Sequence, residues 1–393
     1  MSPEGYRLAL LPGDGIGVEV MEQARRVLDS VGDATQVRWT FDEIDCGALY
    51  FLEHGRDWAE GSEELCLRAD AILLGAIGWP AAQGRGTVLR PDGKMAGWSA
   101  IVGNRINLDL YANVRPVKLL PGVRQRISGR LAQVWRPENV DMVFIRENTE
   151  GLYSGIGGLL APGGRGEVAT DNRVITRRGS ERVIRMAFET ARARSGAPGD
   201  GQRRVTAVVK DNILHGCRFF VSVLEEIAPE YPDVAYEIVL VDAFSQWLLR
   251  NPEHYDVVVA TNMFGDIVTE VGAMLQGGLG LAAAANIGDR HGMFEPVHGS
   301  APRHAGQGRA NPMAMITATA HALEWLGTRH DDHRLTTAST ALRGAVEDVL
   351  VEGRVLTYDL VDGRRPAGTT EVTTAVIERL SERLDLRSLS GAW

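Results

Sequence analysis

Short runs of consecutive apolar residues alternate along this chain with segments in which apolar side chains recur every three or four positions. RLALLPG (7–13), AILLGAIG (71–78) and DVVVATNMFG (256–265) are typical of buried strands, whereas SERVIRMAFETARAR (180–194) has the period of an amphipathic helix. Because buried strands that alternate with helices usually pair in parallel, this pattern predicts an α/β fold with parallel strands.

Further stretches fit the same alternation. Residues 111–117 and 142–146 have the composition of buried strands, and residues 313–327 and 373–384 have helical periodicity. GIGGLLAPGGRG (155–166) contains too many glycines for a regular helix. We therefore expect a projecting hairpin, or arm, near residues 154–175.

Length, charge and cysteine content narrow the class of protein. With 393 residues, the chain is expected to form two domains, or one large α/β unit with a nested second domain. A net charge of −9 without a basic stripe argues against nucleic acid as a partner. No apolar run approaches the roughly 20 residues that span a bilayer, no secretory leader is evident, and Cys46, Cys66 and Cys217 are scattered. We expect a cytoplasmic protein that does not bind membranes.

Four charged residues between positions 210 and 270 lie in or beside short apolar segments. Lys210 occurs in VVKDN and Asp242 in LVDAF, while Asp266 and Glu270 occur in MFGDIVTE. Asp266 and Glu270 are four residues apart in a stretch that can open a helix, so both carboxylates would share one helical face. Oxygen ligands without clustered cysteine or histidine predict a Mg²⁺ or Mn²⁺ site and not a zinc site.

Three arginines precede these residues in the sequence. Arg105, Arg115 and Arg146 each offer forked donors suited to carboxylates. Together with a divalent cation, they predict a small substrate that carries several negative charges and chelates the metal.

Two glycine-rich segments are candidates for cofactor binding. LPGDGIG (11–17) follows a strand but departs from the G-x-G-x-x-G spacing, because Gly17 is followed by Val18. For this segment a structural turn and a cofactor site remain equally plausible. FEPVHGSAPRHAGQGRANP (294–312) combines small residues with Arg303 and His304, which suit a phosphate or a ribose, although an ordinary structured loop is the alternative.

The order of the motifs along the chain resembles that of the isocitrate/isopropylmalate dehydrogenase family, the metal-dependent β-decarboxylating dehydrogenases. The resemblance is carried, in family order, by LPGDGIG, NRINLDLYANVRPVK, IRENTEGLYSG, VVKDN, VDAF, TNMFGDI, GGLGLAAAANIG and FEPVHGSAP…GQGRANP. It implies a doubly wound α/β fold that is not Rossmann, with the active site between two domains. The implied domains are a discontinuous cofactor-binding domain, 1–112 with 275–393, and a central substrate-binding and dimerisation domain, 113–274.

The resemblance also implies a role for each matching residue. Tyr153 matches the proton donor and Lys210 the lysine that acts with it, taking the hydroxyl proton as hydride passes to the nicotinamide. Asp242, Asp266 and Glu270 match the metal ligands, with Lys210 and Asp242 contributed by the partner subunit of a homodimer. Glu270 stands where the family usually has aspartate. The implied substrate-binding residues are Trp98, Ser99, Arg105, Arg115, Arg146 and Asp242.

The resemblance favours NADP over NAD as the cofactor. NAD-dependent members usually have aspartate directly after HGSAP, where this chain has Arg303 followed by His304. Tyr358 resembles a tyrosine that contacts the 2′-phosphate in one NADP-dependent branch, whereas Asp362 replaces the arginine expected beside it. The implied cofactor-binding residues are Ile16, Glu295, His298, Gly299, Ser300, Ala301, Pro302, Arg303, His304, Asn311 and Tyr358.

The segment before Arg105 is expected to read the substituent on C3 of the substrate. Ile101 and Val102 are apolar, as in isopropylmalate and tartrate dehydrogenases, and Trp98 resembles the tartrate dehydrogenase branch. Ser99 resembles isocitrate dehydrogenases, whose neighbouring asparagine is replaced by Ile101. We expect a malate- or tartrate-like 2-hydroxy acid, with 3-isopropylmalate and isocitrate or homoisocitrate as alternatives. A non-catalytic regulatory subunit is the alternative from another class, since Glu270 departs from the family pattern.

Overall fold

The computed structural model describes residues 5–82, 84 and 86–389, which form two compact units. Unit 1 comprises 1–108, 120–134 and 276–393, and unit 2 comprises 109–119 and 135–275, apart from the residues outside that description. Residues 1–4, which begin the N-terminal segment where no secretory leader is expected, lie outside the described residues. Among the described residues, no helix is both long enough and apolar enough to cross a membrane. The assignment of cofactor and substrate binding to separate domains stays a prediction.

The centre of unit 2 is a set of paired strands whose inner members are largely buried, whereas the edge strand Ala235–Leu240 is partly exposed. Its strands lie in the order β11 (Ala235–Leu240), β10 (Arg204–Val209), β12 (Val257–Ala260), β7 (Asp141–Glu147) and β4 (Ala112–Lys118). All neighbours are parallel except β4 and β7, which run antiparallel. The parallel prediction is therefore confirmed for this part of the sheet apart from that pair. The strand predicted over 256–265 is shorter than expected, because α8 begins two residues after it ends.

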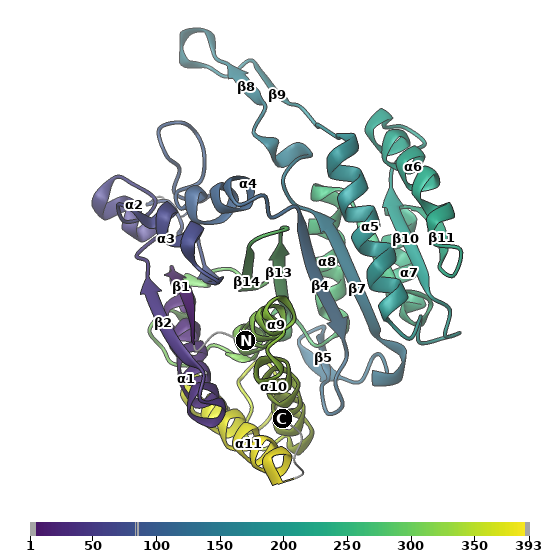
Figure 1. The fold of residues 1–393 in the computed structure, drawn as a ribbon. Coiled ribbons are helices and arrows are strands. Elements are labelled where there is room, and N and C mark those ends of the chain that lie inside the picture. Colours follow the sequence, from purple (N-terminus) through teal and green to yellow (C-terminus); the bar gives the residue numbers. More distant parts are fainter. Residues whose placement is uncertain (1–4, 83, 85, 390–393) are drawn as a thin grey trace. The chain divides into compact units, whose positions relative to one another are not determined.

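Four helices cover the two faces of this sheet. They are α5 (Arg177–Ala193), α6 (His215–Ile227), α7 (Val241–Arg250) and α8 (Asn262–Leu275). In Figure 1, α5 and α6 lie on one face, and α7 and α8 lie on the other. Phe188 of α5 and Phe220 of α6 pack with Val205 and Val257 of the strands, so that the apolar face of each helix is buried.

Unit 1 has its own set of paired strands. These are β13 (Ala283–Ile287), β14 (Gly292–Pro296), β3 (Ala71–Ala76), β1 (Gly5–Gly13) and β2 (Arg38–Glu43), in that order. Only β13 and β14 are antiparallel, because a four-residue turn joins them and leaves no room for a crossover helix. A separate hairpin joins β5 (Gln125–Ile127) to β6 (Arg130–Ala132).

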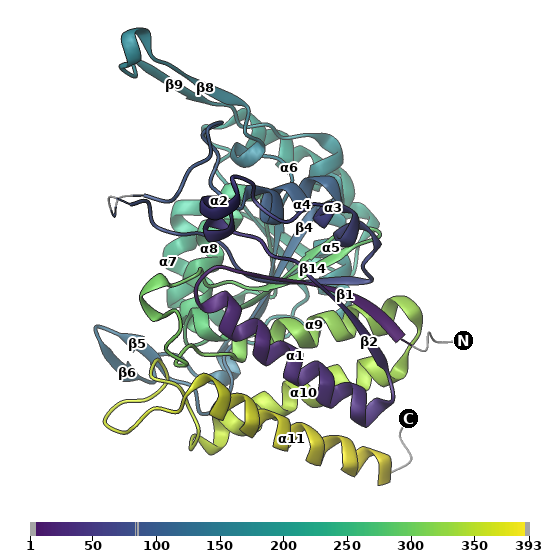
Figure 2. The same cartoon turned by 90° about the vertical axis from the view of Figure 1, so that its left-hand side faces the viewer.

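The helices of unit 1 include one long helix that the sequence pattern did not single out. α1 (Ile16–Thr35) and α9 (Met313–His330) lie on one side of the strands, and α2 (Ala48–His54) and α3 (Ser62–Arg68) lie on the other (Figure 2). The unexpected helix is α10 (His333–Glu352), which packs on α9 and α11 (Thr369–Leu389). The remaining helical elements of the described residues are α4 (Asn104–Asn107), a π-helix at Ser99–Gly103 and 3₁₀ turns at 137–139, 152–154, 162–164, 228–230, 252–254, 279–281 and 302–304.

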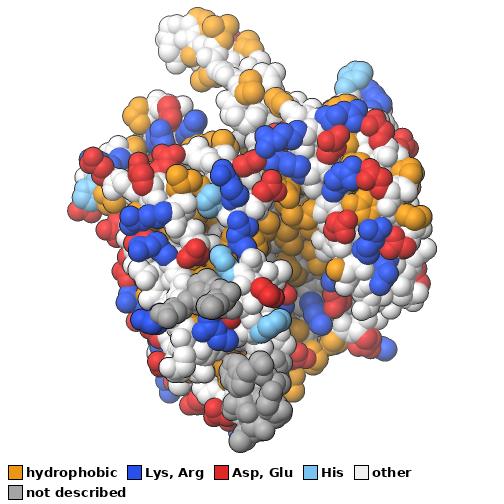
Figure 3. All heavy atoms as spheres, viewed as in Figure 1, with side chains coloured by type: hydrophobic (Ala, Val, Ile, Leu, Met, Phe, Trp, Pro, Cys, Tyr) orange, Lys and Arg blue, Asp and Glu red, His pale blue; other side chains and the backbone are white. Residues whose placement is uncertain are grey.

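The predicted arm is present as an antiparallel hairpin of β8 (Gly157–Leu160) and β9 (Val168–Asp171). The hairpin projects from unit 2 (Figure 2) and carries apolar side chains on its surface (Figure 3). Leu159 is 68% exposed and Leu160 is 61% exposed. A two-stranded ribbon has no core of its own, so these leucines form an exposed apolar surface on the arm.

Candidate functional site

Helix α8 of unit 2 carries the two predicted acidic ligands. Asp266 and Glu270 lie one helical turn apart near the start of this helix, and Glu270 is more exposed than Asp266. The prediction that both carboxylates share one helical face is confirmed, because both contact the same arginine, Arg115.

Arg146 of β7 is the most deeply buried charged side chain beside these carboxylates, with 2% of its surface exposed. Its Nη1 donates to Asp266 Oδ1, while Nε and Nη2 donate to Asn262 Oδ1 at 3.1 and 2.7 Å. Gly265 makes this approach possible, since a Cβ atom at that position would lie 2.6 Å from Arg146 Cγ. A buried guanidinium is thus held by one carboxylate and one amide.

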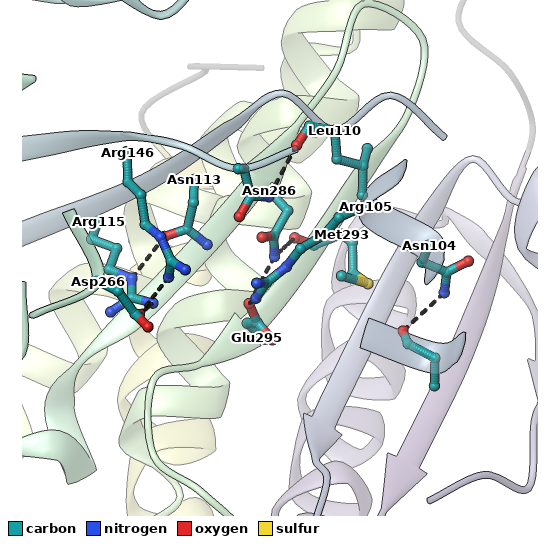
Figure 4. Close-up of polar contacts among 12 residues, drawn as sticks. Asn104, Arg105, Leu110, Asn113, Arg115, Arg146, Asp266, Asn286, Met293 and Glu295 are labelled. Carbon is teal, nitrogen blue, oxygen red and sulfur yellow. Dashed lines mark hydrogen bonds and ion pairs between the residues drawn. The ribbon is translucent and has the colours of Figure 1, made fainter. Parts of the chain in front are cut away.

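Arg115 of β4 approaches the same helix. Its Nη2 donates to Asp266 Oδ1 at 3.3 Å (Figure 4), and Nη1 lies 3.5 Å from Glu270 Oε1. Asn113 Oδ1 accepts from Arg115 Nε at 2.7 Å, and Thr269 Oγ1 accepts from Nη1 at 2.7 Å. These two neutral partners fix the plane of the guanidinium, so that it presents a defined face to a carboxylate.

Tyr153 adds a hydroxyl to this group. The residue lies in the short 3₁₀ turn that follows Gly151, whose φ of 86° favours glycine. Its hydroxyl donates to Asp266 Oδ2 at 3.1 Å, and Arg146 Cζ lies 5.6 Å from the centre of its ring. Because 39% of the side chain is exposed, the hydroxyl can meet a small molecule at this site.

The local charges also affect Glu270. Burial raises the pKa of Glu270, and the charge of Asp266 raises it further, while the charges of Arg115 and Arg146 oppose the rise. The two carboxylates therefore repel each other, and the positive charges of Arg115 and Arg146 offset part of that repulsion.

Lys210 and Asp242 form a second pair in unit 2. Lys210 directly follows β10, and Asp242 lies in the first turn of α7, which directly follows β11. Because β10 and β11 are parallel neighbours, their carboxyl ends bring the two side chains together, and Nζ donates to Asp242 Oδ1 at 2.7 Å. This hydrogen bond, followed by a backbone hydrogen bond, lowers the pKa of Asp242.

The described part of the chain holds no group of three or more aspartate, glutamate, histidine or cysteine side chains that could bind a metal ion. Asp242 accordingly does not join Asp266 and Glu270 within one chain. The donor set still suits a hard cation, since two carboxylates and no thiolate or imidazole are available from α8.

Unit 1 contains the third predicted arginine. Arg105 Nη2 donates to Glu295 Oε1 at 2.9 Å, and Asn286 Nδ2 donates to the same oxygen at 2.9 Å (Figure 4). Both charged side chains are largely buried. Arg105, predicted to hold substrate, is thus oriented by Glu295, which was predicted to contact the cofactor.

The predicted specificity segment begins at a tight turn. Gly97 has a φ of 88°, and the π-helix Ser99–Gly103 follows, a feature often found at functional sites. Ser99 Oγ donates to Asp57 Oδ2 at 2.7 Å, and Lys94 Nζ lies 5.0 Å from the centre of the Trp98 ring. Ile101 and Val102 are partly exposed apolar side chains. All of these residues belong to unit 1.

The two glycine-rich segments meet in unit 1. The amide of Ile16 donates to Ser300 O at 2.9 Å, and a Cβ atom on Gly15 would lie 2.1 Å from that oxygen. The Ser300 hydroxyl donates to the carbonyl of Gly78. LPGDGIG therefore forms a turn that closely approaches the backbone of Ser300, and its role in cofactor binding stays a prediction.

The rest of the second glycine-rich segment divides into two parts. Burial lowers the pKa of His298, whose ring lies against the Gly299 carbonyl at 3.0 Å. Asn311 donates to Asp359 Oδ2 at 2.9 Å and accepts from the Met313 amide at 3.0 Å, so that its side chain organises the start of α9. Ala301 and Pro302 form the turn between these two parts, and Ala301 has a φ of 38°.

Tyr358 is placed between two potential cations. Its ring centre lies 5.4 Å from that of His304 and 4.2 Å from Arg309 Cζ. Asp362 is held by Arg126 at 2.9 Å, so its charge is compensated by that arginine. Arg303 itself is exposed.

Several residues of these sites did not stand out in the sequence. Asn262, Asn113 and Thr269 hold the arginines of unit 2, and Arg309 contacts Tyr358. Asp14, which lies between Gly13 and Gly15, is fully buried and accepts from the amides of Ala48, Leu49 and Gly78. Asp14 could have been noticed in the sequence, because it is an acidic residue between two glycines at the end of a buried strand. The neutral residues that hold the arginines carry no such signal.

Comparison with known proteins places this geometry in context. Residues 7–376 match the family described as isocitrate/isopropylmalate dehydrogenase. A 3-isopropylmalate dehydrogenase from Thermobifida fusca is 41% identical over 335 residues, which cover 83% of this chain and 88% of that protein. A decarboxylating D-malate dehydrogenase from Escherichia coli is 36% identical, with coverages of 88% and 92%. The crystal structure of isocitrate dehydrogenase from Methylococcus capsulatus superposes with a TM-score of 0.80 at 35% identity and covers 95% of this chain and 99% of that one.

Proposed function

The chain belongs to the isocitrate/isopropylmalate dehydrogenase family, and from this premise we propose that it oxidises and decarboxylates a small 2-hydroxy dicarboxylic acid. The family and its named relatives are decarboxylating dehydrogenases that act on hydroxy acids. The identity of the acid, the choice of nicotinamide cofactor and the shared site of a dimer are part of the proposal.

The convergence of Arg115, Arg146 and the Tyr153 hydroxyl on Asp266 is the observation that carries this proposal. Forked guanidinium donors bind carboxylates, and an exposed hydroxyl in the same group can transfer a proton. A surface cluster formed only for stability would not bury Arg146 almost completely beside two carboxylates, because such burial is costly.

Asp266 and Glu270 would hold Mg²⁺ or Mn²⁺ with oxygen ligands. When bound, such a cation supplies Lewis acidity that stabilises negative charge on the hydroxyl and carboxylate oxygens of the substrate. Arg115 and Arg146 would orient the substrate carboxylates, and Arg105 of unit 1 is proposed to bind a further carboxylate.

Lys210 and Tyr153 would move the protons. Lys210 would take the proton of the C2 hydroxyl, and a bound oxidised nicotinamide would supply the acceptor for hydride from C2, so that one hydride and one proton leave the alcohol. The C3 carboxylate then leaves as carbon dioxide, and Tyr153 returns a proton to C3. The hydrogen bond to Asp242 keeps Lys210 oriented between turnovers.

We propose NADP as the preferred cofactor, with NAD as the alternative. Arg303 stands where an acidic residue would bind the ribose hydroxyls, and a cation at that point suits a 2′-phosphate. Support comes from Arg309 and His304 on either side of Tyr358 and from the neutralisation of Asp362 by Arg126.

We further propose a homodimer in which Lys210 and Asp242 of one subunit complete the site of the other. The exposed leucines of the arm support this assembly, as does Ile267, an exposed apolar residue of α8. If the partner subunit contributed its Asp242, this would also explain why the described residues of one chain contain no cluster of three acidic metal ligands.

The segment around Trp98 favours a small or apolar substituent on C3. Trp98 is bulky, and Ile101 and Val102 offer no polar group to a third carboxylate. We therefore favour a malate- or tartrate-like acid. The second candidate is 3-isopropylmalate, which is supported by similarity to the Thermobifida fusca enzyme.

A screen for formation of reduced nicotinamide tests this proposal. Malate, tartrate, 3-isopropylmalate, isocitrate and homoisocitrate would each be offered with NAD⁺ or NADP⁺, in Mn²⁺ or in EDTA. We expect turnover in Mn²⁺ that EDTA abolishes, with the highest kcat/KM for malate or tartrate and NADP⁺. Binding of these acids without turnover of any would instead indicate a regulatory subunit.

A further inference from the structure

The turn that carries Trp98 and Ser99 is anchored by a carboxylate 40 residues earlier in the sequence. Asp57 Oδ1 accepts from the Gly97 amide at 2.9 Å, and Oδ2 accepts from the Ser99 amide at 3.0 Å. Oδ2 also accepts from the Ser99 hydroxyl at 2.7 Å and from Arg90 Nη1 at 2.6 Å. Four donors thus converge on one side chain that is only 2% exposed.

Asp57 is itself held rigidly. It lies between α2 and α3, and its carbonyl accepts from the Gly47 amide at 2.9 Å, next to the β-bridge between Cys46 and Trp58. Burial alone would raise the pKa of Asp57, but hydrogen bonds from Ser99, the Gly97 amide and Arg90 outweigh it, so the pKa is lowered. The anchor is therefore ionised at neutral pH and accepts every hydrogen bond that it forms.

The conformation of the turn depends on this anchor. Gly97 packs closely on Ile77, since a Cβ atom at Gly97 would lie 2.3 Å from Ile77 Cγ2. The preceding segment returns from a turn at 90–94 and packs Val88 and Ala96 against Ala48. The chain therefore reaches Ser99 with little freedom, and Asp57 fixes the amides of Gly97 and Ser99 where the π-helix begins.

The same contacts fix the polarity of the Ser99 hydroxyl. A serine hydroxyl has one proton to donate, and here Asp57 accepts it. Arg90 Nη1 lies 3.4 Å from Ser99 Oγ and donates to it, so only acceptor capacity remains on that oxygen. A substrate carboxylate needs a donor and would find none at Ser99.

On the basis of the proposed function, we propose that Asp57 is a positioning residue for substrate choice. It fixes the Gly97–Ser99 turn and withholds the Ser99 proton, which makes the site reject acids whose C3 substituent ends in a carboxylate. Ser99 would favour isocitrate only after release from Asp57, when its proton and the Arg90 guanidinium could both reach that carboxylate.

Asp57→Ala and Asp57→Asn test this proposal. Asp57→Ala removes all four acceptor interactions, and we expect the ratio of kcat/KM for isocitrate to that for malate to rise about tenfold, since one charge-assisted hydrogen bond has about that effect. Asp57→Asn keeps one oxygen for Ser99 and should stay nearer the wild type. The KM for malate should rise more than kcat falls, because the turn binds substrate and transfers no proton.

Two further variants separate the role of Ser99 from general damage. Ser99→Ala alone should leave the ratio unchanged, whereas Asp57→Ala with Ser99→Ala should lose the gain, which shows coupling between the two residues. Asp92→Ala is the matched control, because Asp92 also pairs with Arg90, at 3.0 Å, but is exposed and does not accept from Gly97 or Ser99.

Hydrogen exchange of the Gly97 and Ser99 amides adds a readout that does not depend on turnover. We expect Asp57→Ala to speed exchange at these amides while Val205 of unit 2 stays protected. Equal loss of activity with all acids, or unchanged exchange at the two amides, would overturn the proposal. A wild-type protein that turns over no acid would contradict the proposed function, and the exchange experiment would still decide whether Asp57 positions the turn.

Discussion

The hydroxyl of Tyr153 donates to Asp266 Oδ2 at 3.1 Å, so one hydrogen bond joins the proposed proton donor to a proposed metal ligand. The same carboxylate accepts from Arg146 and Arg115 through its other oxygen. Asp266 therefore contacts one phenol hydroxyl and two guanidinium groups. Substitution of each group should separate binding of the cation from transfer of a proton.

Removal of the Tyr153 hydroxyl should impair catalysis without impairing cation binding. We expect Tyr153→Phe to lower kcat about 10²- to 10⁴-fold, as for the loss of a general acid. The Kd for Mn²⁺, measured by titration, should change less than about threefold, because oxygen ligands bind this ion and phenol is not among them. Tyr236→Phe, at an exposed position of β11, is the control. A Tyr153→Phe enzyme with wild-type kcat would exclude this residue as the donor.

Glu270 should bind the cation through its charge. We expect Glu270→Gln to weaken Mn²⁺ binding about tenfold or more, since the number of charged ligands tunes affinity. Glu270→Asp keeps the charge and should retain most of the affinity. Glu225→Gln, at an exposed position of α6, controls for the loss of a negative charge. Equal Mn²⁺ affinity in wild type and Glu270→Gln would remove this residue from the proposed ligands.

Arg303 should determine the choice of nicotinamide cofactor. Arg303→Asp replaces a cation by an acceptor, so we expect the ratio of kcat/KM for NADP⁺ to that for NAD⁺ to fall about 10- to 100-fold. Arg290→Asp makes the same charge change at another exposed site of unit 1 and should leave the ratio unchanged. A wild-type preference for NAD⁺ that Arg303→Asp does not alter would contradict this assignment.

Asp332 should make stability depend on pH. It caps α10, accepts from the Tyr6 hydroxyl at 2.9 Å and accepts from Arg334 Nε at 2.9 Å. Burial would raise the pKa of Asp332, but the hydrogen bonds from Arg334 and Tyr6 outweigh burial and lower it. A carboxyl group with a lowered folded-state pKa stabilises the fold fully above the unfolded value of about 3.9. That contribution disappears as the pH falls through the folded-state pKa.

Asp332→Asn should therefore reduce the free energy of unfolding by about 1–3 kcal/mol at pH 7, as for a buried cap with charged partners. Denaturation by urea at pH 7 and below pH 4 measures the effect, and the difference from wild type should shrink at the lower pH. Asp331→Asn, a neighbouring and almost fully exposed change, is the control. A difference that stays constant with pH would contradict the role of the charge.

The sequence predicted the charged residues of the site, whose carboxylate and guanidinium groups the proposed chemistry requires. The carboxylates of Asp266 and Glu270 could be placed on one helical face because their spacing is local. Gly15 and Ser300 could be expected in turns, but their contact could not be foreseen from positions 285 residues apart. The buried residues of α10, among them Leu335, Leu342 and Val349, do recur every three or four positions, but alanines make up much of that stripe and give it little hydrophobic contrast in the sequence.

The neutral partners of the charged groups could not be predicted. Asn262, Asn113 and Thr269 are common surface residue types, and only the folded chain shows that they orient Arg146 and Arg115. The same holds for Asp57, whose four donors come from a segment 33–42 residues further along the chain. Long-range polar contacts of this kind depend on tertiary packing, which leaves no periodic pattern in the sequence.

Lys210 and Asp266 are proposed to act on one substrate, although within a chain Lys210 pairs with Asp242 and Asp266 with Arg146. Lys210→Ala and Asp266→Asn should each be inactive when purified alone. If each site takes Lys210 from one subunit and Asp266 from the other, unfolding and refolding the two variants together should restore about a quarter of the wild-type activity, because half of the dimers then carry one intact site. A mixture as inactive as its components, although mixed dimers have formed, would contradict the account.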